Sequence, residues 1–179
     1  GVWYVLNSSN GQVTVLNFGL IGDQPVADDY DGDGKDDIAV WRPSTGVWYR
    51  INSGNGQFIA FAFGLPTDLA VPADYDGDTK VDVAVFRPSN GLWYRINSTD
   101  GQYVIISFGL SGDIPVPGDY DGDGKDDLVV FRPSSGTWYV LFSEEGFSTY
   151  STQVWGNWYD QPAPGDYDGD GLADHAIWR

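Results

Sequence analysis

The sequence predicts an all-β protein, a small β-propeller with four blades of about 45 residues each. Two observations lead to this prediction. Short segments rich in β-branched and aromatic residues follow one another, and no segment shows sustained helical periodicity. One set of sequence features also recurs four times along the 179 residues, and internal repeats of this length are typical of propellers and other repeat folds.

Four features define the repeat. Aspartate-rich loops open at Asp29, Asp74, Asp119 and Asp166. Trp-Tyr pairs begin at Trp3, Trp48, Trp93 and Trp138, and aromatic-Gly pairs begin at Phe18, Phe63, Phe108 and Trp155. Turn signals fall at Asn10-Gly11, Asn55-Gly56, Asp100-Gly101 and Glu145-Gly146. We therefore expect a single domain over residues 1–179, with repeats 1–42, 43–87, 88–132 and 133–179.

Each part of the repeat is typical of a strand or a turn. Segments 46–53 and 56–64 flank an Asn-Gly turn, which predicts a β-hairpin. An acidic loop leads into segment 82–89, another predicted strand. The short segment 70–74 can add a fourth strand at a sheet edge, where its proline is tolerated. Three or four strands per repeat suggest one propeller blade.

The two ends of the sequence complement each other. The first repeat begins near Trp3 and the last ends at Arg179, so only the Pro-Ser link of the other repeats is missing between them. We expect the Trp3-Tyr4 strand to join the blade built from residues 160–179, so that both termini close the last blade and no edge stays open. The alternative is a segment cut from a longer array of the same repeats, and the start at Gly1 without Met favours a processed or partial chain.

Composition argues against several partners and chemistries. The net charge is −17 with only nine Lys and Arg, which argues against nucleic acid, because phosphates are bound by cationic side chains. No apolar run is long enough to span a membrane, and no basic amphipathic segment is present. The absence of cysteine excludes disulfides, thiolate metal sites and a cysteine nucleophile.

The aspartate-rich loops carry the clearest chemistry. Positions 1, 3, 5 and 9 of each nine-residue loop are aspartates, and the backbone carbonyl at position 7 adds another hard oxygen ligand. Such sets suit calcium better than magnesium, so we expect about four calcium ions, one per repeat. The predicted ligands are Asp29, Asp31, Asp33, Lys35 and Asp37; Asp74, Asp76, Asp78, Lys80 and Asp82; Asp119, Asp121, Asp123, Lys125 and Asp127; and Asp166, Asp168, Asp170, Leu172 and Asp174.

Two other interpretations of these loops are weaker. An EF-hand needs flanking helices and a bidentate Glu at position 12, where the loops instead have Val or Ile. Solvated acidic turns without metal would not explain why four copies keep the same spacing. The second loop is the weak one, because Thr79 replaces the glycine at position 6, where a positive φ is expected.

An aromatic-Gly pair, a D-x-D-x-D-G-x-x-D loop and a short hydrophobic strand resemble the FG-GAP and VCBS-type repeats of integrin-α-like β-propellers. The resemblance covers all four repeats. It implies calcium ions held by the aspartates named above, in extracellular proteins used for adhesion or ligand binding. The strands here end in Arg-Pro-Ser instead of Gly-Ala-Pro, and the repeats are shorter than typical blades of that family. These departures affect the expected number of blades and the expected partner surface, but not the expected metal ligands.

Catalysis has little support in the sequence. The only histidine, His175, aligns with Ile38, Val83 and Leu128, so we expect a partly buried strand residue. Paired carboxylates could in principle serve a glycosidase. An active site is normally one asymmetric place, however, whereas these carboxylates recur four times. We therefore expect no enzyme activity.

Other recurring residues have structural interpretations. We expect the Trp of each Trp-Tyr pair to fill a blade core, with sugar stacking as the alternative. We expect an ion pair across each blade junction, formed by Arg42, Arg87, Arg132 and Arg179 with Asp23, Asp68, Asp113 and Asp160. The irregular fourth repeat carries Trp155, Trp158 and Tyr159, which are candidate ligand-contact residues. Asn7 and Asn97 match the N-glycosylation pattern.

Together these features favour a non-catalytic, secreted or cell-surface module that binds a glycan or an extracellular protein. The alternative is a structural building block of a surface layer, stalk or fibre, which would self-associate. The sequence separates the two poorly, because repeats serve both uses.

Overall fold

The computed structural model describes residues 1–144 and 146–179. Its regular structure consists of β-strands, and no helix occurs in the described residues, so the expected all-β class is confirmed. None of these residues forms a helix that could cross a membrane. The chain divides into two compact units, Gly1–Pro66 and Thr67–Arg179.

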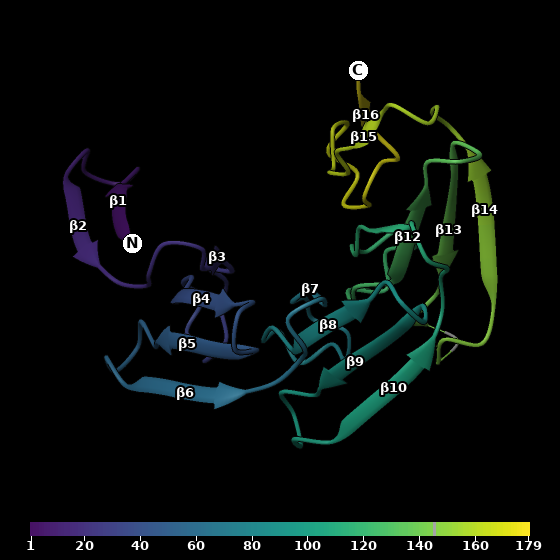
Figure 1. The fold of residues 1–179 in the computed structure, drawn as a ribbon. Helices are drawn as coiled ribbons and strands as arrows, with labels where there is room; N and C mark the ends of the chain where they lie inside the picture. Colours follow the sequence, from purple (N-terminus) through teal and green to yellow (C-terminus); the bar gives the residue numbers. More distant parts are fainter. Residues whose placement is uncertain (145) are drawn as a thin grey trace. The chain divides into compact units, whose positions relative to one another are not determined.

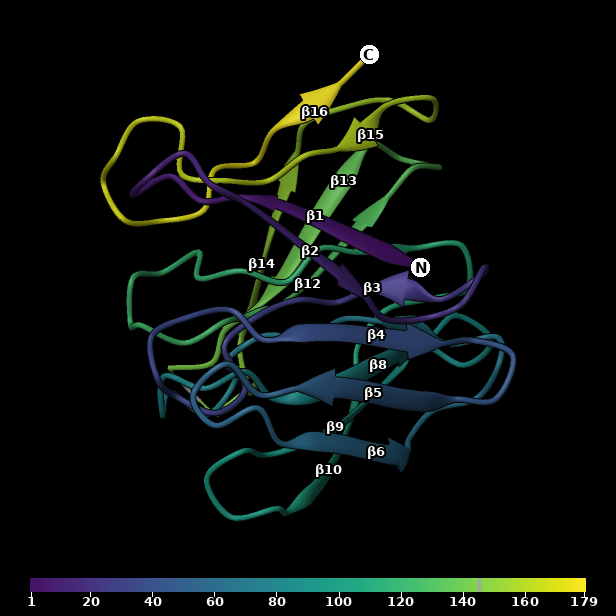
Figure 2. The same cartoon turned by 90° about the vertical axis from the view of Figure 1, so that its left-hand side faces the viewer.

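The first unit contains a hairpin and one four-stranded antiparallel sheet (Figure 1). In the hairpin, β1 (Val2–Leu6) pairs with β2 (Val13–Asn17). The sheet contains, in chain order, β3 (Gln24–Pro25), β4 (Ile38–Arg42), β5 (Val47–Ile51) and β6 (Phe58–Ala62). Figure 2 shows β4, β5 and β6 of this sheet as adjacent strands of alternating direction.

The second unit contains two further four-stranded sheets and one strand pair. One sheet consists of β7 (Leu69–Ala70), β8 (Val83–Arg87), β9 (Leu92–Ile96) and β10 (Tyr103–Ser107). The next consists of β11 (Ile114–Pro115), β12 (Leu128–Arg132), β13 (Thr137–Leu141) and β14 (Tyr150–Val154). The strand pair is β15 (Gln161–Pro162) with β16 (Ile177–Trp178).

The predicted turns and edge strands are present. The hairpins turn at Gly11, Gly56 and Gly101, whose φ angles of 68°, 69° and 72° lie in the region that glycine adopts at low cost. The fourth predicted turn includes Glu145, which lies outside the described residues. In each four-stranded sheet the first strand has only two residues and lies at the edge, as expected for strands that carry or precede proline.

The sheets are offset from the sequence repeats. A four-stranded sheet takes its first two strands from one repeat and its last two from the next; β4, for example, ends at Arg42 where the first repeat ends. By alignment, β1 and β2 match β5 and β6, whereas β15 and β16 match β3 and β4. The expected pairing of the Trp3-Tyr4 strand with segment 160–179 is absent from the strand pairs of the described residues, where β1 pairs only with β2 and β16 only with β15. A count of four blades and closure by both termini therefore stay predictions.

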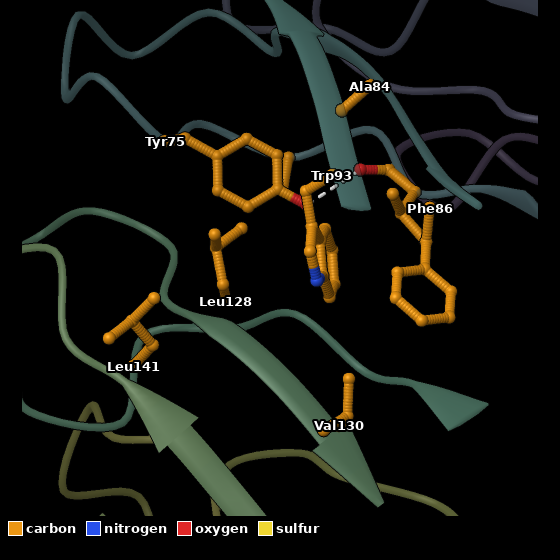
Figure 3. Packing of buried hydrophobic residues seen from close by; sticks show 9 residues of the cluster. Tyr75, Ala84, Phe86, Trp93, Leu128, Val130 and Leu141 are labelled. Atoms are coloured by element: carbon orange, nitrogen blue, oxygen red, sulfur yellow. Dashed lines mark hydrogen bonds between the residues drawn. The ribbon is translucent and has the colours of Figure 1, made fainter. Parts of the chain in front are cut away.

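The tryptophans of the Trp-Tyr pairs pack the sheets. Trp48, Trp93 and Trp138 are at most 4% exposed, which confirms the packing interpretation for these three. Each indole Nε1 donates to the backbone carbonyl of the residue that directly follows the neighbouring outer strand, as Trp93 does to Phe108 at 2.7 Å. Figure 3 shows the core of the second unit, where Trp93 and Phe86 face Leu128 and Val130 of the next sheet. Tyr75, from the loop between β7 and β8, belongs to the same core and so ties that loop to the sheets.

Candidate metal centres

Each aspartate-rich loop connects the first and second strands of a sheet. Its two ends are joined by an isolated antiparallel bridge, for example between Gly118 and Asp127. The other three bridges are Asp28 with Asp37, Ala73 with Asp82, and Gly165 with Asp174. The eight residues between the two bridged positions therefore form a turn whose ends are held together.

The first aspartate of each loop organises the turn. In the third loop, Oδ1 of Asp119 accepts the N–H of Gly122 at 2.6 Å, and its Oδ2 accepts the N–H of Gly124 at 3.0 Å. The same pair of bonds forms at Asp29, Asp74 and Asp166. Since these bonds are local, the loop sequence by itself can build them.

Carboxylates converge in all four loops. In each loop, three aspartates offer oxygen atoms that all lie within 4.8 Å of one another. The converging sets are Asp29, Asp31 and Asp33; Asp74, Asp76 and Asp78; Asp119, Asp121 and Asp127; and Asp166, Asp168 and Asp174. Each loop therefore contains an anionic cluster of three aspartates, and all of them are predicted ligands.

The remaining predicted ligands lie in the same loops but outside these closest sets. They are Asp37, Asp82, Asp123 and Asp170, together with the carbonyls of Lys35, Lys80, Lys125 and Leu172. The carbonyls of Lys35 and Lys80 each accept a long hydrogen bond of 3.4 Å from a serine hydroxyl. The clusters thus bring positions 1 and 3 together in every loop. The third member is position 5 in the first two loops and position 9 in the last two.

The ninth aspartate is buried in the three loops that belong to complete sheets. Asp37, Asp82 and Asp127 are 0% exposed. Oδ2 of Asp127 accepts the N–H of Tyr120 at 3.0 Å, and its Oδ1 accepts the N–H of Ser143 at 2.8 Å. The tyrosine at position 2 is fixed in turn by its hydroxyl, which donates to a backbone carbonyl such as that of Val71 at 2.7 Å from Tyr75.

Sequence reasoning missed the serines that close these loops. Ser53, Ser98 and Ser143 each follow the third strand of a sheet, and each backbone N–H donates to the ninth aspartate. Each hydroxyl donates to the aspartate at position 5, for example from Ser98 to Asp78 at 2.8 Å. A serine sixteen residues after the ninth aspartate recurs in these repeats, and this spacing is the signal that could have identified them.

Position 6 has the backbone conformation that the sequence predicted. The φ angles of Gly34, Gly124 and Gly171 are 81°, 82° and 92°. Thr79 adopts the same conformation with φ 70°, which is costly for a β-branched residue. The expectation of a strained second loop is therefore supported by its backbone.

Burial changes the acidity of the ninth aspartates. Desolvation raises the pKa of Asp82 and of Asp127 to about 6, although the N–H of Ser98 or Ser143 partly offsets it. The pKa of Asp37 is raised for the same reason. Ionised carboxylates at these positions are therefore unfavourable without a compensating cation.

The donor sets fit a hard divalent cation. Oxygens bound to one calcium ion at roughly 2.3–2.6 Å lie at most about 5 Å apart, so three oxygens that all lie within 4.8 Å of one another can share one such ion. The number of oxygen donors in each loop, rather than their spacing, favours calcium over magnesium, which usually keeps several waters. Cationic side chains compensate only in part. Lys35 lies 3.6 Å from Asp33 with a largely exposed ammonium, and burial raises the pKa of Asp37 and Asp82 by more than the charges of Arg50 and Arg95 lower it.

The recurring Arg–Asp pairs form as predicted, but not across a junction between sheets. Arg87 Nε and Nη2 both donate to Asp68 at 2.8 Å, and the same bidentate pair forms three more times. Both partners flank the first two strands of one sheet, so the pair braces that sheet. Arg87 also lies over the ring of Tyr94, 4.2 Å from its centroid. This geometry indicates a structural role.

The other candidate residues lie outside the clusters. His175 is half-buried beside Tyr120 and Trp138, with ring centroids 5.0 and 5.1 Å away, and burial lowers its pKa. It precedes β16 and does not join a cluster of ligand atoms among the described residues. Trp155, Trp158 and Tyr159 are 54%, 74% and 52% exposed. They lie in the segment between β14 and β15, away from the aspartates of the loops in sequence.

The fold is similar to that of solved enzymes of low identity. Two crystal structures of virginiamycin B lyase from Staphylococcus aureus match with TM-scores of 0.57 and 0.52 at 15% and 11% identity. The match covers 95% and 84% of this chain, but this chain spans only about half of those proteins, 54% and 47%. At this identity the likeness shows a propeller-like fold and nothing about activity.

A search of curated proteins finds no match. The model of the FG-GAP-like repeat matches three overlapping stretches, residues 29–85, 74–130 and 119–177. Each stretch begins at the first aspartate of one loop and extends into the strand after the next loop. The matches span most of the chain, and the protein therefore belongs to the family of FG-GAP-like repeat proteins.

Proposed function

We propose that this protein is a calcium-stabilised, non-catalytic binding module that works outside the cell. The observation that carries the proposal is the convergence of three carboxylates in each of four loops. Four dications would change the formal net charge from −17 to −9, which relieves repulsion within and between the loops. Repetition of one metal centre in every repeat supports a structural role for the metal.

The expected calcium affinity of the loops favours a location outside the cell. Flexible extracellular calcium sites have dissociation constants of roughly 0.1–1 mM. Loops of this exposed kind would fill at millimolar extracellular calcium and stay empty at cytosolic concentrations. At about ten times the dissociation constant, each site adds on the order of 1.4 kcal/mol to the free energy of unfolding.

The test is thermal unfolding together with calorimetric titration. We expect calcium binding at about four sites and a melting temperature that rises by well over 10 °C between chelator and millimolar calcium. Asp121→Ala should remove one site and part of that rise. Asp100→Asn, which alters an aspartate in a hairpin turn outside the loops, should change neither. An identical melting temperature in chelator and calcium would refute the proposal.

The exposed aromatic residues of segment 155–159 supply the binding surface in this proposal. Trp158 and Tyr159 pack edge to face, with ring centroids 5.3 Å apart, and leave most of the indole exposed. Exposed aromatic faces suit glycan rings or apolar side chains of a protein partner. Binding on a glycan array should disappear with Trp158→Ala and persist with Leu110→Ala, a matched change in the corresponding loop of the preceding sheet.

A structural building block is the second candidate. Its specific support is the pair of two-stranded sheets, because β1 and β16 each have one side without a paired strand in the described residues. Unpaired strand edges favour association with further strands. A silent glycan array together with end-to-end association in electron microscopy would favour this candidate over the binding module.

A further inference from the structure

Neighbouring loops in the second unit contact each other through their backbones. The N–H of Asp126, at position 8 of the third loop, donates to the carbonyl of Asp74 at 2.8 Å. The N–H of Asp74 in turn donates to Oδ2 of Asp126, also at 2.8 Å. Two reciprocal hydrogen bonds therefore join residues that are 52 positions apart in the sequence.

Both residues are placed to affect metal ligands. Asp74 is the first aspartate of the second loop, and its carboxylate accepts the N–H groups of Gly77 and Thr79 at 2.7 Å. Asp126 lies between Lys125, whose carbonyl is a predicted ligand, and the buried Asp127. The two hydrogen bonds therefore connect a predicted ligand residue of the second loop with a residue that lies between two predicted ligands of the third.

Side chains of the second and third loops also pack against each other. A Cβ atom added to Gly77 would come within 2.8 Å of Cε of Lys125, so the side chain of Lys125 lies directly against the second loop. The contact between the third and fourth loops is weaker. Ala173 donates its N–H to the carbonyl of Asp119 at 2.7 Å, but it has no carboxylate to accept a bond in return.

We propose that Asp126 is a positioning residue that couples calcium binding in the second loop to calcium binding in the third. The proposal rests on the proposed function, because it assumes that these loops bind calcium. A cation in the third loop fixes residues 125–127, which fixes the backbone of Asp74 and lowers the ordering cost of the second loop. By linkage the effect is reciprocal.

The expected coupling is modest. Coupling between sites is typically 5- to 150-fold in affinity, and two hydrogen bonds place this case near the lower end, at about fivefold. Repulsion between the two bound cations opposes the effect, but it is screened over about 8 Å at physiological ionic strength. Calcium should therefore bind the pair of loops with positive cooperativity.

The experiment isolates the two loops. Asp31→Ala and Asp168→Ala inactivate the first and fourth loops, and adding Asp121→Ala or Asp76→Ala then leaves only the second or only the third. Calorimetric titration gives the affinity of each loop alone and of both together. We expect the product of the two calcium association constants of the two-loop protein to exceed the product of the association constants of the two single-loop proteins about fivefold. We call this ratio the excess.

Three variants test the residue itself. Asp126→Ala should reduce this excess to about twofold, because the bond from the N–H of Asp74 is lost while the backbone bond from residue 126 to the carbonyl of Asp74 remains. Asp126→Asn, which keeps an oxygen acceptor without the charge, should retain most of it. Asp36→Ala removes a carboxylate at the same position of the first loop, which is already inactivated in these proteins, and should have no effect.

The outcomes separate the two proposals. An absence of calcium binding in every protein would overturn the proposed function and this inference with it. Calcium binding at both loops with no excess, or an excess that Asp126→Ala leaves unchanged, would overturn the inference alone, as would equal losses with Asp126→Ala and Asp126→Asn. The comparison of two-loop and single-loop proteins needs no change at residue 126, so it decides the matter even if Asp126→Ala does not fold.

Discussion

The third and fourth loops have the same aspartates at the ligand positions, yet their surroundings differ. Asp127 is fully buried, and both of its oxygens accept backbone N–H groups. Asp174 is partly exposed; its Oδ2 accepts the N–H of Tyr167, but its Oδ1 receives no hydrogen bond within the residues that the structure describes. Tyr167 is 69% exposed, whereas Tyr120 is half-buried.

The difference shows which part of the centre the loop builds alone. In both loops the first aspartate accepts the same two local N–H bonds, and three carboxylates converge. The ninth aspartate is buried in the three loops where a serine after the third strand of the sheet donates its backbone N–H to it. The sheet of β15 and β16 has only two strands in the structure, so its loop lacks that serine.

The largest expected effect is that of removing the ninth carboxylate. Asp127→Ala leaves the buried N–H groups of Tyr120 and Ser143 without their acceptor and removes a metal ligand. We expect a loss of about 4 kcal/mol in the free energy of unfolding in calcium, since each unsatisfied buried donor costs roughly 1–3 kcal/mol. Asp174→Ala should cost about 2 kcal/mol, because it affects only one N–H, that of the exposed Tyr167, and removes a ligand of the fourth loop. Urea denaturation measures both free energies of unfolding, and equal losses would show that burial of the ninth aspartate does not add to stability.

The pH dependence is the next largest effect, and it concerns the calcium-free protein. The pKa of Asp127 and of Asp82 in the folded state is about 6, above the value of roughly 3.9 in unfolded chains. Between these values the folded state binds more protons, so stability should fall as the pH rises from about 4 to about 6, by on the order of 2 kcal/mol for each carboxyl.

Calcium should abolish this fall, because a bound cation favours the ionised carboxylate. Urea denaturation in chelator and in calcium over that pH range tests the prediction. Asp127→Asn should remove its share of the fall in chelator, and a calcium-free protein whose stability rises over the same range would contradict the assignment.

The loops were predictable from sequence because their bonds are local. The spacing of Asp119, Asp121 and Asp127 is sufficient to indicate convergence, since Gly122 and Gly124 supply the turn and its N–H donors. The contacts of the serine after the third strand with the loop aspartates, here called the serine cap, were not predictable from one repeat. The same holds for the contact of Asp126 with Asp74. They depend on how strands and neighbouring sheets pack, and only the recurrence of Ser53, Ser98 and Ser143 gave a signal.

The serine cap should have a smaller effect that falls on affinity. Ser143→Ala removes the hydroxyl that donates to both oxygens of Asp123, at 3.1 and 3.0 Å, but keeps the backbone N–H that contacts Asp127. We expect the calcium affinity of the third loop to fall about fivefold, which corresponds to roughly 1 kcal/mol. Calorimetric titration of proteins that retain one loop measures this change, and Ser135→Ala, outside the loops, is the control. The unmodified fourth loop should bind more weakly than the unmodified third loop, and the reverse order would show that the cap is irrelevant.

The smallest expected effect separates the second loop from the third. Thr79 has φ 70° where Gly124 has φ 82°, and no atom lies within 4 Å of a Cβ built on Gly124. Backbone strain is therefore the only difference that a side chain makes at this position. A β-branched residue with positive φ costs about 1–3 kcal/mol, while glycine loses about 0.5–1 kcal/mol more entropy on folding.

Thr79→Gly should accordingly stabilise the protein by about 1 kcal/mol at most, and Gly124→Thr should destabilise it by a similar amount. The two changes exchange the residues of the two loops, so they should also exchange the order in which the loops lose calcium during titration with a chelator. Urea denaturation gives the free energies, and single-loop proteins give the affinities. If Gly124→Thr is neutral, the turn tolerates side chains at position 6, and the weakness of the second loop must come instead from its other differences, Val81 in place of Asp126 and Arg95 in place of Val140.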